Sequence, residues 1–156
     1  MLDVTKLDLD DIATALSDQN AYDQRWLIDP RTGEIFYWTS DTGIDGENPI
    51  DLDELDLLPI NPLPSSVWYA DMRDFAEGVS DAAAGRRLAR AISGRGAFRR
   101  FKDELYEEYP ELVQVWFDFR DVRARRRAVE WLLDEGLVAE EAAQQFLQGH
   151  PSPSLP

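Results

Sequence analysis

The segment Ser93-Gly94-Arg95-Gly96 constrains the fold more than any other, because it separates two amphipathic helical patterns. Apolar residues recur every three or four positions on both sides of it, at Ala84, Leu88 and Ile92 and again at Phe98, Phe101 and Leu105. Glycine supplies the backbone freedom that a tight turn between helices needs. The pattern therefore predicts two helices joined by a glycine turn, with these apolar side chains packed inside.

The rest of the C-terminal half also has helical periodicity. We expect a helix that Ser65 or Ser66 caps, a long helix from Pro110 to Glu135, and a short helix over Ala139–Leu147. Pro110 suits the first turn of the long helix, because the N–H that proline lacks would have no partner there. Together with the pair at the glycine turn, these elements predict a bundle of four or five helices.

The N-terminal part combines one helix with strand patterns. Residues Asp8–Ser17 fit a short helix whose first turn is acidic, which complements the helix dipole. Two apolar runs, Tyr22–Ile28 and Glu34–Thr39, flank a turn that contains proline and glycine, so they predict a β-hairpin. A third strand is expected near Leu55–Leu58. The predicted fold class is α+β: an N-terminal helix and a small antiparallel β-hairpin or three-stranded sheet, followed by the helical bundle.

The length of the chain suits one domain. A chain of 156 residues can bury about 68–70% of its unfolded surface without a disulfide or a metal. We place this domain over residues 1–148, with an acidic helix, hairpin and loop part at 1–64 and a helical part at 65–148. Residues 149–156 are rich in proline and serine and are expected to form a disordered tail.

The formal net charge of −15 is unevenly distributed. Residues 1–66 carry a net charge of −12, whereas residues 67–131 carry +1. The stretch from Arg86 to Lys102 has seven bases and no acid. The overall charge opposes long-range attraction to nucleic acid or to an anionic membrane. The basic stretch nevertheless indicates a local site for an anion or an acidic partner.

Several kinds of chemistry are excluded or disfavoured by the residues that the chain lacks. It has no cysteine, which excludes disulfides, thiolate metal sites and thiol catalysis and fits a reducing compartment. Its one histidine, His150, lies in the Pro/Ser tail, so neither nucleophile–histidine catalysis nor a histidine zinc site is expected. The acidic runs near Asp8 and Asp51 lack the pattern of a calcium loop. We therefore expect no metal and no cofactor, and an enzyme is the least favoured class.

The chain carries no signal for a membrane or for secretion. No apolar run approaches the roughly 20 residues of a membrane span. The start, Met1-Leu2-Asp3-Val4, lacks the basic and apolar regions of a secretory signal. We expect a cytoplasmic protein without a membrane partner.

The arginines form a second pattern if the chain turns tightly at Tyr109-Pro110 into an antiparallel helical hairpin. Residues equally distant from the turn then lie level, so that Arg99 lies beside Arg120 and Gly96 beside Arg123. The arginines expected to converge at one end of the hairpin, without local acids, are Arg95, Arg99, Arg100, Arg120, Arg123, Arg126 and Arg127. Such a cluster needs an anionic counterpart. The counterpart could be the acidic N-terminal half, a phosphate-bearing ligand at the glycine turn, or an acidic face of a partner protein.

Helix-turn-helix binding of DNA is an alternative that the spacing permits. Residues Asp81–Ile92, the glycine turn and Ala97–Glu108 have the lengths of that motif. The second helix, however, has Glu104, Glu107 and Glu108 in its second half. Sequence-specific DNA binding therefore ranks below a protein partner.

The run AISGRGAFRRFKD, from Ala91 to Asp103, resembles a family of small, acidic bacterial proteins, uncharacterised protein family 0158 (UPF0158). The likeness spans most of residues 8–135, and further similar positions are Ile28-Asp29, Thr32-Gly33-Glu34, Ser65-Ser66, Tyr69, Met72, Phe75, Ala128 and Trp131-Leu132. The resemblance implies one compact bacterial domain. It implies no activity, because the family has none that is established.

We predict a non-catalytic cytoplasmic interaction or regulatory protein. It would bind a protein partner through the Arg-rich end of the helical hairpin or through the acidic N-terminal part. The alternative is binding of nucleic acid or a phosphate ligand at the Gly94-Arg95-Gly96 turn and at Arg99 and Arg100. The predicted anion- or partner-binding residues are Arg95, Arg99, Arg100, Lys102, Arg120, Arg123 and Arg127.

Overall fold

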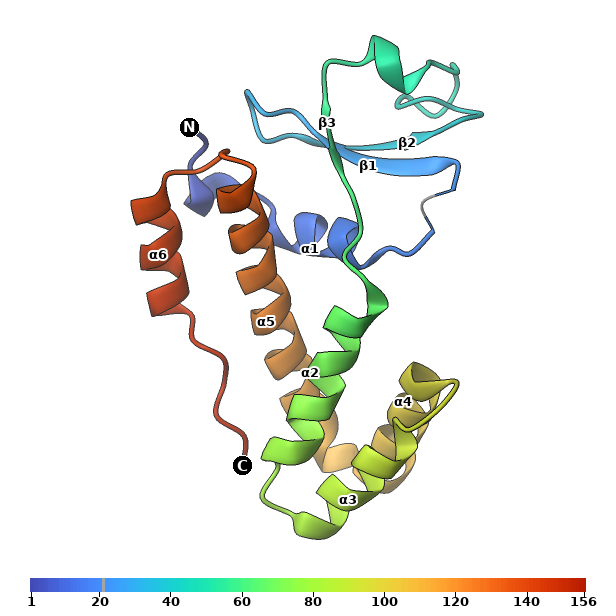
Figure 1. Cartoon of the computed structure of the whole chain (residues 1–156), viewed down its shortest axis with the longest axis vertical. Helices are drawn as coiled ribbons and strands as arrows, with labels where there is room; N and C mark the ends of the chain where they lie inside the picture. The colour runs from blue at the N-terminus through green and yellow to red at the C-terminus, as the bar shows by residue number, and fades with distance from the viewer. Residues whose placement is uncertain (21) are drawn as a thin grey trace. The chain divides into compact units, whose positions relative to one another are not determined.

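The computed structural model describes residues 1–20 and 22–156, which form two compact units. Unit 1 consists of Met1–Leu63 and Ala124–His150, and unit 2 of Pro64–Arg123 and Pro151–Pro156. The long helix α5, Val113–Asp134, contributes its first half to unit 2 and its second half to unit 1. The α-helices and strands of both units are labelled in Figure 1. A small antiparallel sheet and helices on both sides of it in the sequence confirm the predicted α+β class.

The sheet of unit 1 has three antiparallel strands in the order β2-β1-β3 (Figure 1). Strands β1 (Gln24–Ile28) and β2 (Ile35–Thr39) form the predicted hairpin, and β3 (Leu58–Ile60) pairs with the other edge of β1. Leu27 and Ile28 of the central strand are buried. The two apolar runs and the turn with proline and glycine between them therefore predicted this hairpin correctly.

The third strand lies later in the chain than the predicted Leu55–Leu58. Residues Leu52–Glu54 instead form a 3-10 turn, η2, which the N–H of Leu55 closes by donating to the carbonyl of Leu52 at 3.0 Å. Pro59 then lies inside β3, which is an edge strand. Proline is tolerated at an edge, because the N–H that it lacks is not needed for pairing on the open side.

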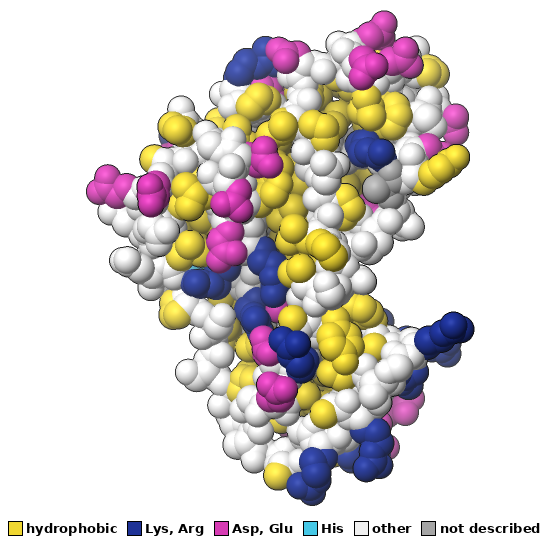
Figure 2. All heavy atoms as spheres, in the orientation of Figure 1, with side chains coloured by type: hydrophobic (Ala, Val, Ile, Leu, Met, Phe, Trp, Pro, Cys, Tyr) yellow, Lys and Arg dark blue, Asp and Glu magenta, His cyan; other side chains and the backbone are white. Residues whose placement is uncertain are grey.

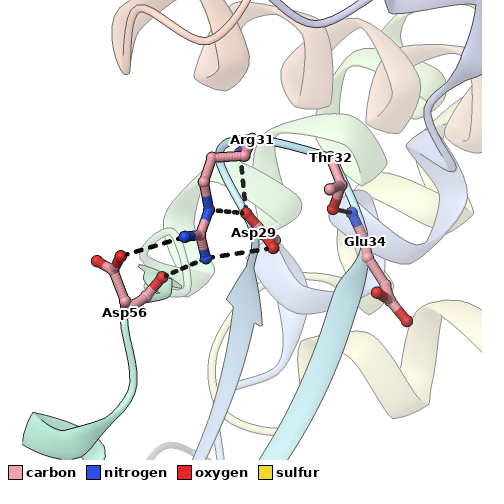
Figure 3. A network of polar contacts seen from close by, with 5 residues as sticks. All are labelled: Asp29, Arg31, Thr32, Glu34 and Asp56. Atoms are coloured by element: carbon pink, nitrogen blue, oxygen red, sulfur yellow. Dashed lines mark hydrogen bonds and ion pairs between the residues drawn. The ribbon is translucent and has the colours of Figure 1, made fainter.

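A polar network around Arg31 holds the turn between β1 and β2 (Figure 3). The Asp29 carboxylate accepts hydrogen bonds from Nε of Arg31 at 3.0 Å and from its backbone N–H at 2.9 Å, and these bonds lower the pKa of Asp29. The same guanidinium lies 3.4 Å from a carboxylate oxygen of Asp56, so it ties the segment before β3 to the turn. Gly33 completes the turn with a φ of 82°.

An aspartate side chain marks the start of the first α-helix of unit 1. Helix α1 (Leu9–Ser17) begins at Asp8, whose carboxylate accepts the N–H of Asp11 at 3.0 Å. The 3-10 turn η1 (Val4–Lys6) precedes it, and α6 (Glu140–Gly149) follows α5. The fully buried side chains of this unit include Ile12, Leu16, Leu27, Ile28, Ile60 and Leu132.

Unit 2 is helical. Its elements besides the first half of α5 are α2 (Ser65–Gly78), α3 (Ala82–Ala91), α4 (Ala97–Glu108) and the 3-10 turn η3 (Pro110–Leu112). Asp81 caps α3, and its carboxylate accepts the N–H groups of Ala83 and Ala84 at 3.0 and 3.2 Å. The predicted serine cap of α2 is wrong, because its N-cap is Pro64, which has no side-chain oxygen to accept a hydrogen bond.

The core of unit 2 is an aromatic cluster around Phe75, which is fully buried. The Phe75 ring lies 6.2 Å from that of Phe101, 5.3 Å from that of Trp116 and 5.6 Å from that of Phe119, measured between ring centres. Tilted and edge-on contacts of this kind are the ones that aromatic rings prefer. The cluster joins α2, α4 and α5.

The glycine turn joins α3 to α4 as predicted. Gly94 and Gly96 have φ values of 84° and 72°, which lie in the left-handed region that L side chains avoid. Gly96 is also the N-cap of α4. Glycine at these two positions therefore allows the chain to reverse between the helices.

The sequence predicts a disordered tail over residues 149–156, but in the structure Gly149 ends α6 and residues 151–156 belong to unit 2. The Leu155 side chain packs against the hydrophobic core of that unit. The N–H of Ser80 donates to the carbonyl of Pro156 at 2.6 Å. Gly78 leaves the space for this contact, because a Cβ there would lie 2.6 Å from Cδ1 of Leu155.

Candidate functional site

An aromatic cavity of about 250 Å³ opens between α2, α4 and α5 of unit 2. Its aromatic lining residues are Trp68 of α2, Phe98, Phe101 and Tyr106 of α4, and Trp116 and Phe117 of α5. Three charged side chains, Asp71, Lys102 and Arg120, also line it. Apolar walls with a few convergent polar groups are typical of binding sites.

Helix α4 supplies side chains to the rim of the cavity as well as to the core of unit 2. Phe98, Lys102 and Tyr106 lie four residues apart, which places them on one face of the helix. Phe98 is 49% exposed and Tyr106 is 42% exposed, whereas Phe101 is buried. The prediction that Phe98 packs inside is therefore wrong: Phe98 lies in the first turn of α4, and half of its side chain stays exposed at the cavity rim.

Two of the predicted cationic residues meet at this cavity. Nζ of Lys102 lies 5.7 Å from the centre of the Tyr106 ring, and the Arg120 guanidinium lies 4.8 Å from that of Phe117. Arg120 also forms a 3.0 Å ion pair with its neighbour Asp121. Within residues 1–20 and 22–156, Lys102 forms no ion pair with a carboxylate. The positive charge of Lys102 is thus available to an acidic group from outside.

Arg123 has a different role from the one predicted. Its Nε lies 3.2 Å from the Asp71 carboxylate, and a terminal nitrogen lies 2.8 Å from the carboxylate of Asp74. Asp71 is only 1% exposed. The expectation that Arg123 lacks local acids is wrong, because α2 presents both aspartates to α5. Arg123 therefore neutralises a buried carboxylate in the cavity wall.

The Arg100 guanidinium is bound to the glycine turn. Its Nε donates to the carbonyl of Ala91 at 2.8 Å, and its terminal nitrogens donate to the carbonyls of Ser93 and Arg95. Carbonyls at a helix C-terminus have no partner within the helix. Arg100 satisfies the carbonyl of Ala91, the last residue of α3, and two carbonyls of the glycine turn, so an external anion would have to compete with three hydrogen bonds.

We expect the Arg100→Ala variant to lose about 1–3 kcal/mol of unfolding free energy, because three carbonyls lose a charged donor. Urea unfolding followed by circular dichroism measures this loss. Arg99→Ala is the matched control, since Arg99 is exposed and lies 3.8 Å from Asp103, a helical ion pair worth about 0.3–0.5 kcal/mol. Equal losses in the two variants would contradict the capping role.

The remaining predicted residues do not line the cavity. Arg95 and Arg99 are exposed beside the glycine turn, and Arg127 is half-buried in unit 1. Arg126, also in unit 1, donates to the carbonyls of Leu147 and His150 at 2.6 and 2.8 Å. Of the predicted set, the structure therefore brings only Lys102 and Arg120 to this cavity, within the residues that it describes.

The acids of α4 take part in contacts with α3. Nε of Arg87 lies 2.7 Å from a Glu104 carboxylate oxygen, and a terminal nitrogen lies 3.5 Å from Glu108. Desolvation opposes the charge of Arg87, but Glu104, Tyr109 and Glu108 outweigh it and raise the pKa of Arg87. These pairs fasten α3 to α4 on the side away from the cavity rim residues.

Acidic and basic side chains gather on different parts of the surface that Figure 2 shows. Figure 2 shows acidic side chains gathered over the loop of unit 1 that carries η2, and basic side chains along α3 and beside the glycine turn in unit 2. Hydrophobic side chains are exposed on the same face of unit 2. An acidic ligand with an apolar part would therefore match this surface of unit 2.

One pattern in the sequence indicates this cavity, although it was not among the predicted site features. Trp68, Tyr106 and Phe117 were not among the predicted site residues, although the spacing of Phe98, Lys102 and Tyr106 marks a mixed aromatic and basic stripe.

Across the described ranges, 1–20 and 22–156, no group of three histidine or acidic side chains is placed to hold a metal ion. No helix in those ranges is long and apolar enough to cross a membrane.

Comparisons with known proteins identify the family. The model of the uncharacterised protein family UPF0158 matches residues 1–149. A UPF0158 protein of Pseudomonas aeruginosa is 38% identical over 89 residues, which cover 57% of this chain and 56% of that relative. The match thus spans little more than half of the relative's length. No solved structure matches the chain. Because the family model covers nearly the whole sequence, the chain belongs to the uncharacterised protein family UPF0158.

Proposed function

We propose that this protein is a non-catalytic, cytoplasmic interaction protein that binds an acidic segment of a partner protein at the cavity of unit 2. The observation that carries the proposal is the combination of an aromatic cavity of about 250 Å³ with Lys102 and Arg120 in its lining. Aromatic and arginine side chains around a desolvated pocket are the residues that dominate binding energies at protein interfaces.

A binding role is favoured over catalysis, because the carboxylate in the cavity lining is buried and already paired with an arginine. Asp71 is the only carboxylate among the lining residues, and it is held by Arg123 at 3.2 Å. A general acid or base must be able to exchange its proton with a substrate. An aspartate that is buried and paired in this way is better suited to supporting the cavity wall.

A protein partner is favoured over nucleic acid by charge. The chain carries a net charge of −15, which repels a polyanion at long range. Arg100, one of the residues expected to bind phosphate, already donates to three carbonyls. A short acidic segment needs only the two local cations, and its apolar side chains can enter the cavity.

A photo-crosslinking amino acid at position 98 tests this proposal. Phe98 lies on the cavity rim and is exposed, whereas Tyr37 of unit 1 is exposed but does not line this cavity, so it is the control position. We expect position 98, but not position 37, to crosslink a specific protein in cells of the source organism. The captured protein is then identified by mass spectrometry and purified.

The purified partner should bind the Lys102→Glu/Arg120→Glu variant about tenfold or more weakly than the wild type, because two attractive charges become repulsive. The Arg86→Glu/Arg90→Glu variant is the matched control, since it makes the same charge change on exposed residues of α3. Equal binding to both variants in titration calorimetry would refute the proposed site.

A further inference from the structure

The cavity has room for a bicyclic aromatic side chain. Its volume is about 250 Å³, and an apolar cavity of about 150 Å³ accommodates benzene. An indole is the largest aromatic side chain and fills such a space better than a phenyl ring or a leucine. Size therefore favours tryptophan as the side chain that enters.

The walls are built to contact an aromatic ring. Trp116 packs against Phe101 with ring centres 4.8 Å apart and planes at 62°, and Tyr106 lies 6.3 Å from Phe117. Aromatic rings prefer such edge-on and tilted contacts, so an inserted ring would extend the existing cluster.

The charges around the cavity favour particular residues beside the inserted tryptophan in the partner's sequence. Lys102 projects from α4 and Arg120 from α5, so cations from two different helices line the same cavity. Acidic residues near the anchor in the partner's sequence would meet these cations. Basic neighbours would be repelled by them.

We propose that the segment bound at this cavity is acidic and is anchored by one tryptophan side chain. This inference rests on the proposed function and specifies the chemistry of the partner. It predicts a tryptophan with glutamate or aspartate on both sides in the partner's contact segment. The cavity, with its rim residues Phe98 and Tyr106, is then the determinant of specificity.

Short synthetic peptides and the full chain test this inference. One peptide has a central 5-fluorotryptophan flanked by glutamates, and its companions have phenylalanine, leucine or alanine at the centre or lysines as flanks. Calorimetry gives the affinities, and the ¹⁹F resonance of the ring reports its burial. We expect the tryptophan peptide to bind about tenfold or more tightly than the alanine peptide, and the lysine-flanked peptide not to bind.

Two protein variants locate the binding. Phe98→Ala and Tyr106→Ala should each weaken the tryptophan peptide by about tenfold and abolish the shift of its ¹⁹F resonance. Tyr37→Ala is the control and should bind like the wild type. Circular dichroism of each variant shows whether it is folded, so a loss of binding is not confused with a loss of structure.

Three results would overturn the inference. The first is equal binding of the tryptophan and alanine peptides, and the second is the absence of binding by any acidic peptide. The third is tighter binding of a single-stranded oligonucleotide than of the tryptophan peptide, which would make stacking of bases the function of the cavity. The proposed function fails separately, if the crosslinked partner binds the charge-reversed and control variants equally.

Discussion

Replacement of Arg123 with leucine should lower the free energy of unfolding by about 3–5 kcal/mol, because it leaves a buried carboxylate without its counter-charge. Asp71 is buried and lies 3.2 Å from Nε of Arg123, and Asp74 lies 2.8 Å from a terminal nitrogen of the same side chain. The Arg123 guanidinium also lies 5.0 Å from the centre of the Phe119 ring. Urea unfolding followed by far-ultraviolet circular dichroism measures the loss.

Two controls distinguish the loss of the buried ion pair from the loss of any positively charged side chain. Arg73→Leu removes an arginine whose contact with Asp74 is 3.5 Å long and exposed, and it should cost less than about 1 kcal/mol. The double variant Asp71→Leu/Arg123→Leu should recover much of the loss, because apolar residues of similar volume often replace a buried ion pair without cost. A double variant as unstable as Arg123→Leu would refute this explanation.

Replacement of Phe75 with alanine should cost about 3–5 kcal/mol, because it removes a buried aromatic ring and leaves a cavity at the centre of unit 2. Phe75 contacts rings from α4 and α5, with centres 5.3 to 6.2 Å away. The lost ring would therefore weaken the packing of three helices at once. The same unfolding experiment measures the effect.

Phe98→Ala is the matched control for this substitution. It makes the same chemical change in the same unit, but Phe98 is half-exposed on the cavity rim. We expect its loss of stability to stay below about 1 kcal/mol. If both variants were equally unstable, Phe98 would be a core residue and its use as a binding residue would lose its basis.

The glycine turn illustrates how a local pattern predicts structure. Two glycines between two amphipathic runs predicted a reversal between helices, and both have positive φ values. The N-caps of α1 and α3, Asp8 and Asp81, obey an equally local rule, because an aspartate before a helix accepts the free N–H groups of its first turn. The serine cap of α2 failed, because Pro64 occupies the cap position directly before both serines.

The arginines illustrate where such local reasoning ends. Arg99 and Arg100 are neighbours in the sequence, yet one is an exposed side chain and the other donates to three carbonyls. Arg120 and Arg123 lie one helical turn apart, yet the first lines the cavity and the second neutralises a buried aspartate of α2. Charge runs alone did not distinguish these roles.

The sequence by itself therefore determined the elements of this protein: its helices, its hairpin, its glycine turn and its fold class. It could do so because hydrophobic periodicity, capping residues and glycine conformations act within a few neighbouring positions. Only the tertiary structure decided which cations remain available for binding and that Phe98, Tyr106 and Trp116 enclose a cavity. The physical reason is that a long flexible side chain takes its partner from elements distant in the sequence, and these elements become neighbours only when the helices pack.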